Sequence, residues 1–256
     1  MSLRPDAPLT WTDTYTVRAY ETDPSGEASV LTLCNYLQET AGSHAEALGV
    51  VYDPEGDPPY AWVLSRLTVR VRRSPRWRER VHLETWPAAH DGRLYADRAF
   101  LLRDDDGHPL LHGLSAWLVF DLARRRPVRL PAEIRALQFP DRALPVALPE
   151  DKLPLPEAPT HTASFEVRYS DLDVNRHTNN VRYLAWAIET LPKDLHTSHR
   201  LTEATLDFRA ETVQGDRVDA TATVHDAPDG ALRVAHGLRL ASGREVVAAE
   251  THWAPR

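Results

Sequence analysis

Cysteine is almost absent from this sequence, since Cys34 is the single cysteine among 256 residues. A single cysteine excludes an internal disulfide, and it also excludes a zinc site built from several cysteines. No segment approaches the run of about eighteen apolar residues that a membrane span needs, and no basic segment followed by an apolar one opens the chain. We therefore expect neither a membrane span nor a signal peptide, and a cytoplasmic protein in a reducing compartment.

Lysine is also scarce, because Lys152 and Lys193 are the only two in the chain and nearly all positive charge is arginine. The net charge of −7 argues against a general nucleic-acid binder. The arginines gather in RLTVRVRRSPRWRER, residues 66–80, and again at Arg124 to Arg126. Such a run can be a strand face that is exposed to water, or alternatively a docking surface for an acidic partner.

The stretch FEVRYSDLDVNRHTNNVRYLAWAIETLP, residues 165–192, combines a polar segment with an apolar helical run that Pro192 closes. Asp173, Asn175 and His177 lie within five residues, directly ahead of the expected start of the helix. A helix N-terminus has unpaired N–H groups and partial positive charge, so it can stabilise an oxyanion. The alternative is that these residues only form a turn and cap the helix.

The chain contains an internal repeat, because residues 15–41 match residues 165–191 without a gap when 150 is added to each number. Val17 then meets Val167, and Asp23 meets Asp173. Residues 68–81 match a later segment with an offset of 137, and residues 99–117 match another with an offset of 136. Three matches in the same order indicate a tandem duplication.

Each half is expected to contain a strand, a helix and a run of antiparallel strands. The helix of the first half is expected over 29–48, with Gly49 ending it, and that of the second half ends before Pro192. Cys34 lies within the first helix, where we expect a small buried hydrophobic residue rather than a reactive thiol. The expected strands cover 62–73, 80–90, 94–103, 109–120, 202–211, 217–225, 232–240 and 245–253.

Proline divides the chain, since eight of the twenty prolines fall within residues 126–159. We expect an N-terminal domain over 1–125, a proline-rich linker over 126–160 that can include a short helix near 132–137, and a C-terminal domain over 161–256. A helix wrapped by an antiparallel sheet is the hotdog architecture. The predicted fold class is therefore α+β, a tandem (double) hotdog.

The two halves differ where chemistry can occur. Ser25 and Glu27 occupy the positions that match Asn175 and His177, so the shared architecture does not require the asparagine and the histidine. Glu211, near the end of an expected strand, is matched with Ser74. It is a second candidate for chemistry, although a glutamate exposed to water at a strand end remains the alternative.

The segment DLDVNRHTNNVRYLAWAIETLP resembles the signature region of the acyl-acyl-carrier-protein thioesterases, the plant enzymes and their bacterial relatives. LDFRAETVQGDRV, residues 206–218, resembles the second motif of that family, and the resemblance covers nearly the whole chain. It implies a catalytic group made of Asp173, Asn175, His177 and Glu211. Plant members have a cysteine directly after the glutamate, where this chain has Thr212, so a mechanism with that cysteine as nucleophile cannot apply.

The implied reaction is hydrolysis of a fatty acyl thioester on acyl carrier protein (ACP) to free fatty acid and holo-carrier protein. The alternatives are an acyl-CoA thioesterase of the hotdog class, a hotdog dehydratase and a non-catalytic acyl-binding protein. Glu211 or Asp173 would be the base or nucleophile, and His177 would orient groups and move protons. Asn175 and a backbone N–H near Asn180 would hold the carbonyl oxygen.

No cofactor and no metal are expected, and His196 and His199 form a weak candidate for a metal pair. The first half would hold the acyl chain and the second would carry the chemistry. A homodimer is left open. An acidic carrier protein would dock on Arg70, Arg72, Arg73, Arg76 and Arg78.

Overall fold

The computed structural model describes residues 3–4, 6–51, 60–137 and 139–256, and its chain divides into two compact units. The first unit consists of Met1–Ser65 and Val71–Ala147, and the second of Arg66–Arg70 and Leu148–Arg256. None of the described helices is long and apolar enough to cross a membrane.

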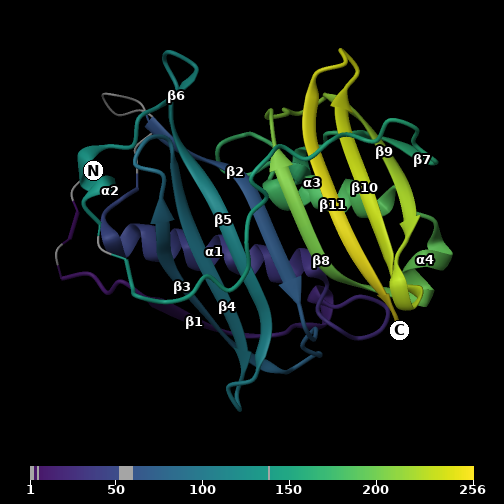
Figure 1. Cartoon of the computed structure of the whole chain (residues 1–256), viewed down its shortest axis with the longest axis horizontal. Coiled ribbons are helices and arrows are strands. Elements are labelled where there is room, and N and C mark those ends of the chain that lie inside the picture. The colour runs from purple at the N-terminus through teal and green to yellow at the C-terminus, as the bar shows by residue number, and fades with distance from the viewer. Residues whose placement is uncertain (1–2, 5, 52–59, 138) are drawn as a thin grey trace. The chain divides into compact units, whose positions relative to one another are not determined.

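The first unit packs one long helix on an antiparallel sheet, and Figure 1 shows α1 crossing the strands of this unit. In the sheet, β1, β3, β4 and β5 lie side by side in that order, β2 follows β5, and β6 pairs with β5. The elements are β1 (Trp11–Thr16), η1 (Ala19–Glu21), α1 (Val30–Leu48), β2 (Tyr60–Val71), β3 (Arg80–His90), β4 (Tyr95–Asp104), β5 (Pro109–Asp121), β6 (Arg126–Val128) and α2 (Ala132–Arg135).

Helix α1 begins and ends as its sequence predicts. The Ser29 hydroxyl accepts the N–H of Thr32 at 3.1 Å, and Gly49 adopts the left-handed conformation, with φ 71°, that ends the helix. Cys34 is buried in this helix, and burial raises the pKa of its thiol to about 12. The prediction that Cys34 is a buried hydrophobic residue is confirmed, and its thiol stays protonated near neutral pH.

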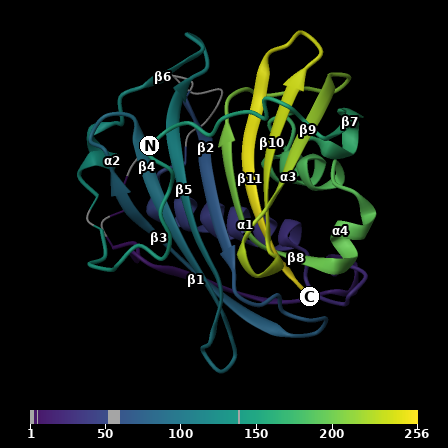
Figure 2. The same ribbon diagram turned by 45° about the vertical axis from the view of Figure 1, so that its right-hand side comes forward.

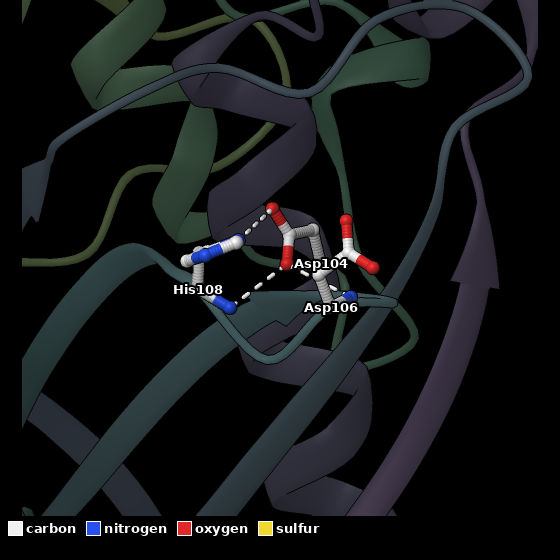
Figure 3. Close-up of side chains that lie close together, drawn as sticks. All are labelled: Asp104, Asp106 and His108. Carbon is white, nitrogen blue, oxygen red and sulfur yellow. Dashed lines mark hydrogen bonds and ion pairs between the residues drawn. The ribbon is translucent and has the colours of Figure 1, made fainter.

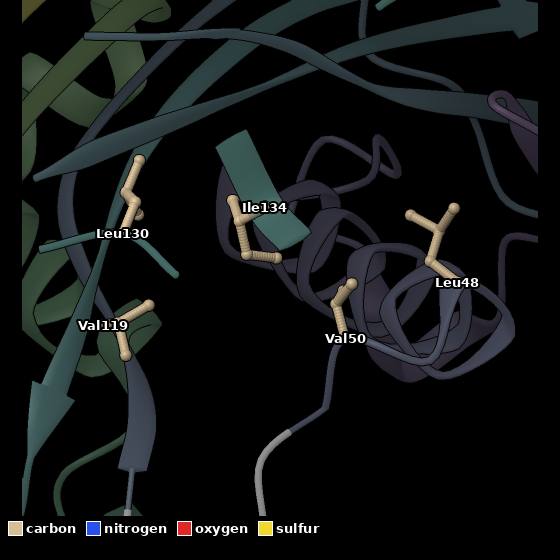
Figure 4. Packing of buried hydrophobic residues seen from close by; sticks show 5 residues of the cluster. All are labelled: Leu48, Val50, Val119, Leu130 and Ile134. Carbon is tan, nitrogen blue, oxygen red and sulfur yellow. The ribbon is translucent and has the colours of Figure 1, made fainter. Parts of the chain in front are cut away.

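The C-terminal end of α1 packs into an apolar cluster that Figure 4 shows, formed by Leu48, Val50, Val119, Leu130 and Ile134. Leu130 and Ile134 come from the proline-rich stretch, and Ile134 lies on α2, the short helix that the sequence predicts. The beginning of that stretch therefore contributes to the core of the first unit.

The second unit repeats the plan with a shorter helix. Its sheet has the order β8, β11, β10, β9, β7. Residues 66–70 of β2 pair with the other side of β8. Helix α3 packs against β9, β10 and β11, as Figure 2 shows. The elements are β7 (His161–Glu166), η2 (Tyr169–Asp171), α3 (Asn180–Glu189), α4 (Lys193–Ser198), β8 (His199–Phe208), β9 (Arg217–Asp226), η3 (Pro228–Gly230), β10 (Leu232–Leu240) and β11 (Glu245–Pro255).

The strand registers of the two units correspond residue by residue. Trp11 lies opposite Thr85, and His161, 150 residues later, lies opposite Ala222. The offset of 137 between Thr85 and Ala222 is the one that the sequence comparison predicts. The α+β tandem hotdog is therefore confirmed.

The predicted end of one strand in the second unit, near Glu211, is wrong. Strand β8 ends at Phe208 rather than at Glu211, because the N–H groups of Arg209 and Ala210 both donate to the carbonyl of Val246 and regular pairing stops there. Glu211 consequently lies in the loop after β8. Helix α3 ends at Glu189, before Pro192 as predicted, and Pro192 stands at the N-cap of α4.

Buried neutral histidines make stability depend on pH. Burial lowers the pKa of His236 from 6.5 to about 3 and that of His44 to about 4. The unfolded chain binds more protons than the folded one between these values and 6.5, so the stabilisation is present above pH 6.5 and is lost as the pH falls. A fully shifted histidine contributes a slope of about 1.4 kcal/mol per pH unit to the free energy of unfolding.

We expect His236→Phe to reduce this slope between pH 6.5 and 4, measured by urea unfolding at several pH values. Phe100 occupies the equivalent position of the first unit, so phenylalanine fits the fold there. His225→Phe is the matched control, because His225 is an exposed histidine on β9. An unchanged slope in a folded His236→Phe variant would contradict the assignment.

Candidate active site

The turn ahead of α3 is held by one aspartate. Oδ1 of Asp173 accepts the N–H groups of Asn175 at 2.8 Å and His177 at 3.3 Å. The N–H of Asp173 donates in turn to the carbonyl of His177 at 2.8 Å, and Arg176 adopts a positive φ of 62°. This turn leaves the Asn175 side chain exposed and the His177 side chain partly buried.

The first unit contains the same turn without the same side chains. Oδ1 of Asp23 accepts the N–H groups of Ser25 at 2.8 Å and Glu27 at 3.4 Å, and Gly26 has a φ of 78°. Both units therefore use the aspartate to shape the backbone. What distinguishes the second unit is the pair of side chains that the turn presents.

A buried carboxylate anchors the turn to α3. The side chain of Asp171 is fully buried, and it accepts the N–H of Arg168 at 2.9 Å. The guanidinium groups of Arg168 and Arg182 lie 3.3 and 3.5 Å from its oxygens. Asn179 caps α3 by accepting the N–H of Val181 at 2.9 Å. The backbone that precedes the helix is thus fixed on both sides of His177.

A buried hydroxyl network joins this turn to the loop after β8. Thr212 is buried, and its hydroxyl lies 2.7 Å from that of Thr178 and 3.0 Å from that of Tyr183. The Thr178 hydroxyl donates its one hydrogen to the Thr212 carbonyl, so it accepts a hydrogen bond from the Thr212 hydroxyl. The Thr212 hydroxyl in turn accepts from the hydroxyl of Tyr183, whose oxygen also accepts the Thr212 N–H. The Thr212 hydroxyl proton is therefore committed to Thr178. Burial also raises the pKa of Tyr183, which keeps its donor proton.

The network brings together two of the four predicted site residues. Nε2 of His177 lies 3.5 Å from Oε2 of Glu211, and both side chains remain partly exposed to solvent. Asp173 acts on the backbone of the turn, and in the described part of the chain the Asn175 side chain makes no hydrogen bond. The matched positions in the first unit hold Glu27 and Ser74, which cannot form this pair.

A carboxylate beside an imidazole that water can reach is suited to proton transfer. The carboxylate can accept a proton from water, and the imidazole can deliver one to a leaving group. Thr178 and Tyr183, which position this pair, were missed by the sequence analysis. The helical spacing of the apolar run indicates that Tyr183 is buried, but it gives no sign of what the phenol contacts.

Two other clusters of polar residues are explained by local structure. Asp104, Asp106 and His108 can each present a ligand atom within 4.8 Å of the others. Figure 3 shows their side chains close together. They form the hairpin turn between β4 and β5, where Oδ1 of Asp104 accepts the N–H groups of the other two. His196 packs against Trp253, and His199 bonds the Gly230 carbonyl, so the weak metal pair is engaged in separate contacts.

Comparison with known proteins places both halves in one family. Residues 8–138 match the family described as the acyl-ACP thioesterase N-terminal domain, and residues 156–255 match the acyl-ACP thioesterase C-terminal domain. The palmitoyl-acyl carrier protein thioesterase of Gossypium hirsutum is 32% identical over 268 residues, covering 97% of this chain and 64% of its own length. The dodecanoyl-acyl-carrier-protein hydrolase of Umbellularia californica is 32% identical over 262 residues, with coverages of 97% and 68%.

Solved structures agree with this placement. The 12:0-ACP thioesterase from Umbellularia californica superposes with a TM-score of 0.86 at 28% identity, covering 97% of this chain and 95% of that one. An acyl-ACP thioesterase from Bacteroides thetaiotaomicron has the same fold, with a TM-score of 0.83, 24% identity and coverages of 96% and 98%. The chain spans roughly two thirds of the length of the two plant sequences (64% and 68%). Since the two family matches together cover most of its residues, this chain belongs to the acyl-ACP thioesterase family.

Proposed function

We propose that this protein hydrolyses fatty acyl-ACP to free fatty acid and holo-carrier protein, in the cytoplasm. The observation that carries the proposal is the contact of His177 with Glu211, which the second unit makes and whose residues the first unit lacks. Family membership supports the substrate class, because the relatives that match along 97% of the chain are named for acyl-ACP hydrolysis.

In the proposed mechanism Glu211 is the general base. Its carboxylate takes a proton from water, and the water oxygen bonds to the thioester carbonyl carbon to give a tetrahedral oxyanion. Collapse of the oxyanion breaks the carbon–sulfur bond, and the proton that Glu211 took from water passes through His177 to the departing thiolate. Asp173 positions His177 through the turn, as its two N–H bonds indicate.

The oxyanion needs a hydrogen-bond donor, and Asn175 is the proposed one. Its side-chain amide is exposed on the same turn as His177, two residues away, and the N-terminus of α3 follows directly. An amide donor near a helix N-terminus favours negative charge on the carbonyl oxygen.

The two halves have separate tasks in this proposal. The first, over 1–125, holds the acyl chain and is non-catalytic, the second, over 161–256, performs the chemistry, and 126–160 links them. Support comes from Glu27 and Ser74, which stand in the first half where the reacting pair stands in the second.

The proposed docking surface for the carrier protein comprises Arg72, Arg76 and Arg78. Of the five arginines expected to dock, Arg70 is paired with Glu203 at 2.6 Å and Arg73 with Glu79 at 2.6 Å. The other three are exposed and form no ion pair within the described residues. The Arg78 guanidinium lies 4.3 Å from the ring centre of Trp77, which is itself 52% exposed. Unpaired arginines around an exposed indole suit an acidic protein surface.

The reaction is tested by release of free thiol from acyl-ACP and acyl-CoA across chain lengths. We expect Glu211→Gln to lower the rate by about 10²-fold or more, the scale of general acid–base catalysis. Thr212→Ala removes a buried hydroxyl but keeps the backbone hydrogen bonds of residue 212 to Thr178 and Tyr183, so it is expected to keep most activity. Cys34→Ser is expected to do likewise. A folded Thr212→Ala protein as inactive as Glu211→Gln would contradict the mechanism.

Acyl binding without thiol release would favour the non-catalytic alternative, and faster release from acyl-CoA would favour that substrate.

The docking surface is tested by reversing charge at Arg76 and Arg78 together. We expect the double Glu variant to raise the KM for acyl-ACP and leave the KM for acyl-CoA nearly unchanged, with an effect that shrinks at high salt. Arg126→Glu is the control, since Arg126 is an exposed arginine on β6. Equal changes for both substrates would place the docking surface elsewhere.

A further inference from the structure

Among the residues that the structure describes, one cation on the sheet of the first unit has no anion beside it. Nη1 of Arg98, on β4, donates to Nδ1 of His44 at 2.9 Å and lies 3.3 Å from the hydroxyl of Thr85. His44 is on α1, so the guanidinium lies on the sheet face that the helix covers. Arg98 forms no ion pair with any residue that the structure describes, and its Nε and Nη2 donors bond to none of them.

Neither contact compensates the charge. Nε2 of His44 lies 2.8 Å from the carbonyl of Pro8, which can only accept, so Nε2 carries the hydrogen and Nδ1 accepts from Arg98. Thr85 donates its own hydroxyl to the carbonyl of Ala99 at 2.9 Å. Both partners are neutral acceptors. A partly buried cation with neutral partners and unused donors lowers stability unless something binds it.

The fold itself does not require this cation. Arg98 lies opposite Ser115, and Val234 lies opposite Thr251 at the same place in the second unit. Trp117 donates to Ser115 at 2.8 Å, and Trp253 donates to Thr251 at the same distance, so the surroundings correspond closely. The second unit nevertheless fills this place with an apolar cluster: Leu191, Leu195, Ala222, Val234 and Trp253.

The helix side of this place also differs. Ala41 of α1 matches Leu191, one of the residues of that apolar cluster. At this place the first unit therefore has a smaller side chain on its helix, Ala41 instead of leucine, and a charged side chain on its sheet, Arg98 instead of valine. Thr85 likewise replaces the Ala222 of the second unit. At the place where the second unit has a packed apolar cluster, the first unit therefore has the polar groups of Arg98 and Thr85.

We propose that Arg98, supported by His44 and Thr85, binds an oxygen atom carried by the distal part of the acyl chain, such as a terminal hydroxyl. This inference rests on the proposed function: the thioester end is at His177 and Glu211, so the part of the substrate inside the first unit is the far part. A hydroxyl gains a charge-assisted hydrogen bond from the guanidinium, whereas a methyl group only removes water from it.

The test compares saturated acyl-ACP substrates with their ω-hydroxy counterparts of equal length. The native enzyme is expected to show, at one or more lengths, a higher kcat/KM for the hydroxylated chain. Arg98→Met should lower the ratio of the two kcat/KM values by about tenfold or more, the scale of a hydrogen bond to a charged group. Arg103→Met is the control, since Arg103 lies on the same strand and bonds the Gly107 carbonyl.

Binding of the matched free acids, measured by calorimetry, gives a readout that is independent of turnover. If Arg98→Met does not fold, Arg98→Gln replaces it, because glutamine removes the charge but keeps an amide donor to His44. An unchanged ratio in a folded variant, or equal binding of both acids by the native protein, would overturn the inference. If the native protein releases no thiol from either substrate, the proposed function fails, and the binding comparison still decides on the site.

Discussion

A carboxylate that accepts two backbone N–H groups shapes the turn ahead of the core helix in both units, and the rest of the site depends on it. Asp173 holds the second turn and Asp23 the first with the same geometry. Because the backbone is fixed by a residue that both copies keep, the side chains at the turn can vary freely. One copy presents Asn175 and His177, and the other presents residues that cannot perform the same chemistry.

Burial then decides which groups can react. Cys34 is enclosed in α1 with its pKa raised to about 12, and the Thr212 hydroxyl is engaged with Thr178 inside the second unit. Both alternatives to a carboxylate are thereby removed from contact with water. Glu211 is exposed, because the doubled hydrogen bond at Val246 ends β8 three residues earlier and leaves the glutamate in a loop.

The sequence predicted most of the fold because its patterns are strong: Ser29 and Gly49 bound α1 as expected, and strand registers follow the offsets of the repeat. It missed the early end of β8, since a carbonyl that accepts two N–H groups leaves no mark on side-chain alternation. It also could not distinguish paired from unpaired arginines. Whether Arg70 meets Glu203 depends on strand pairing between residues far apart in the chain.

The central claim is that His177 and Glu211 act as one unit, and a double-mutant cycle on thiol release from acyl-ACP tests it most directly. The single variants His177→Ala and Glu211→Ala are compared with the double variant, with folding checked by circular dichroism. If the pair acts together, the double variant loses little more rate than the worse single one. Losses that multiply, so that each residue contributes independently, would contradict the account.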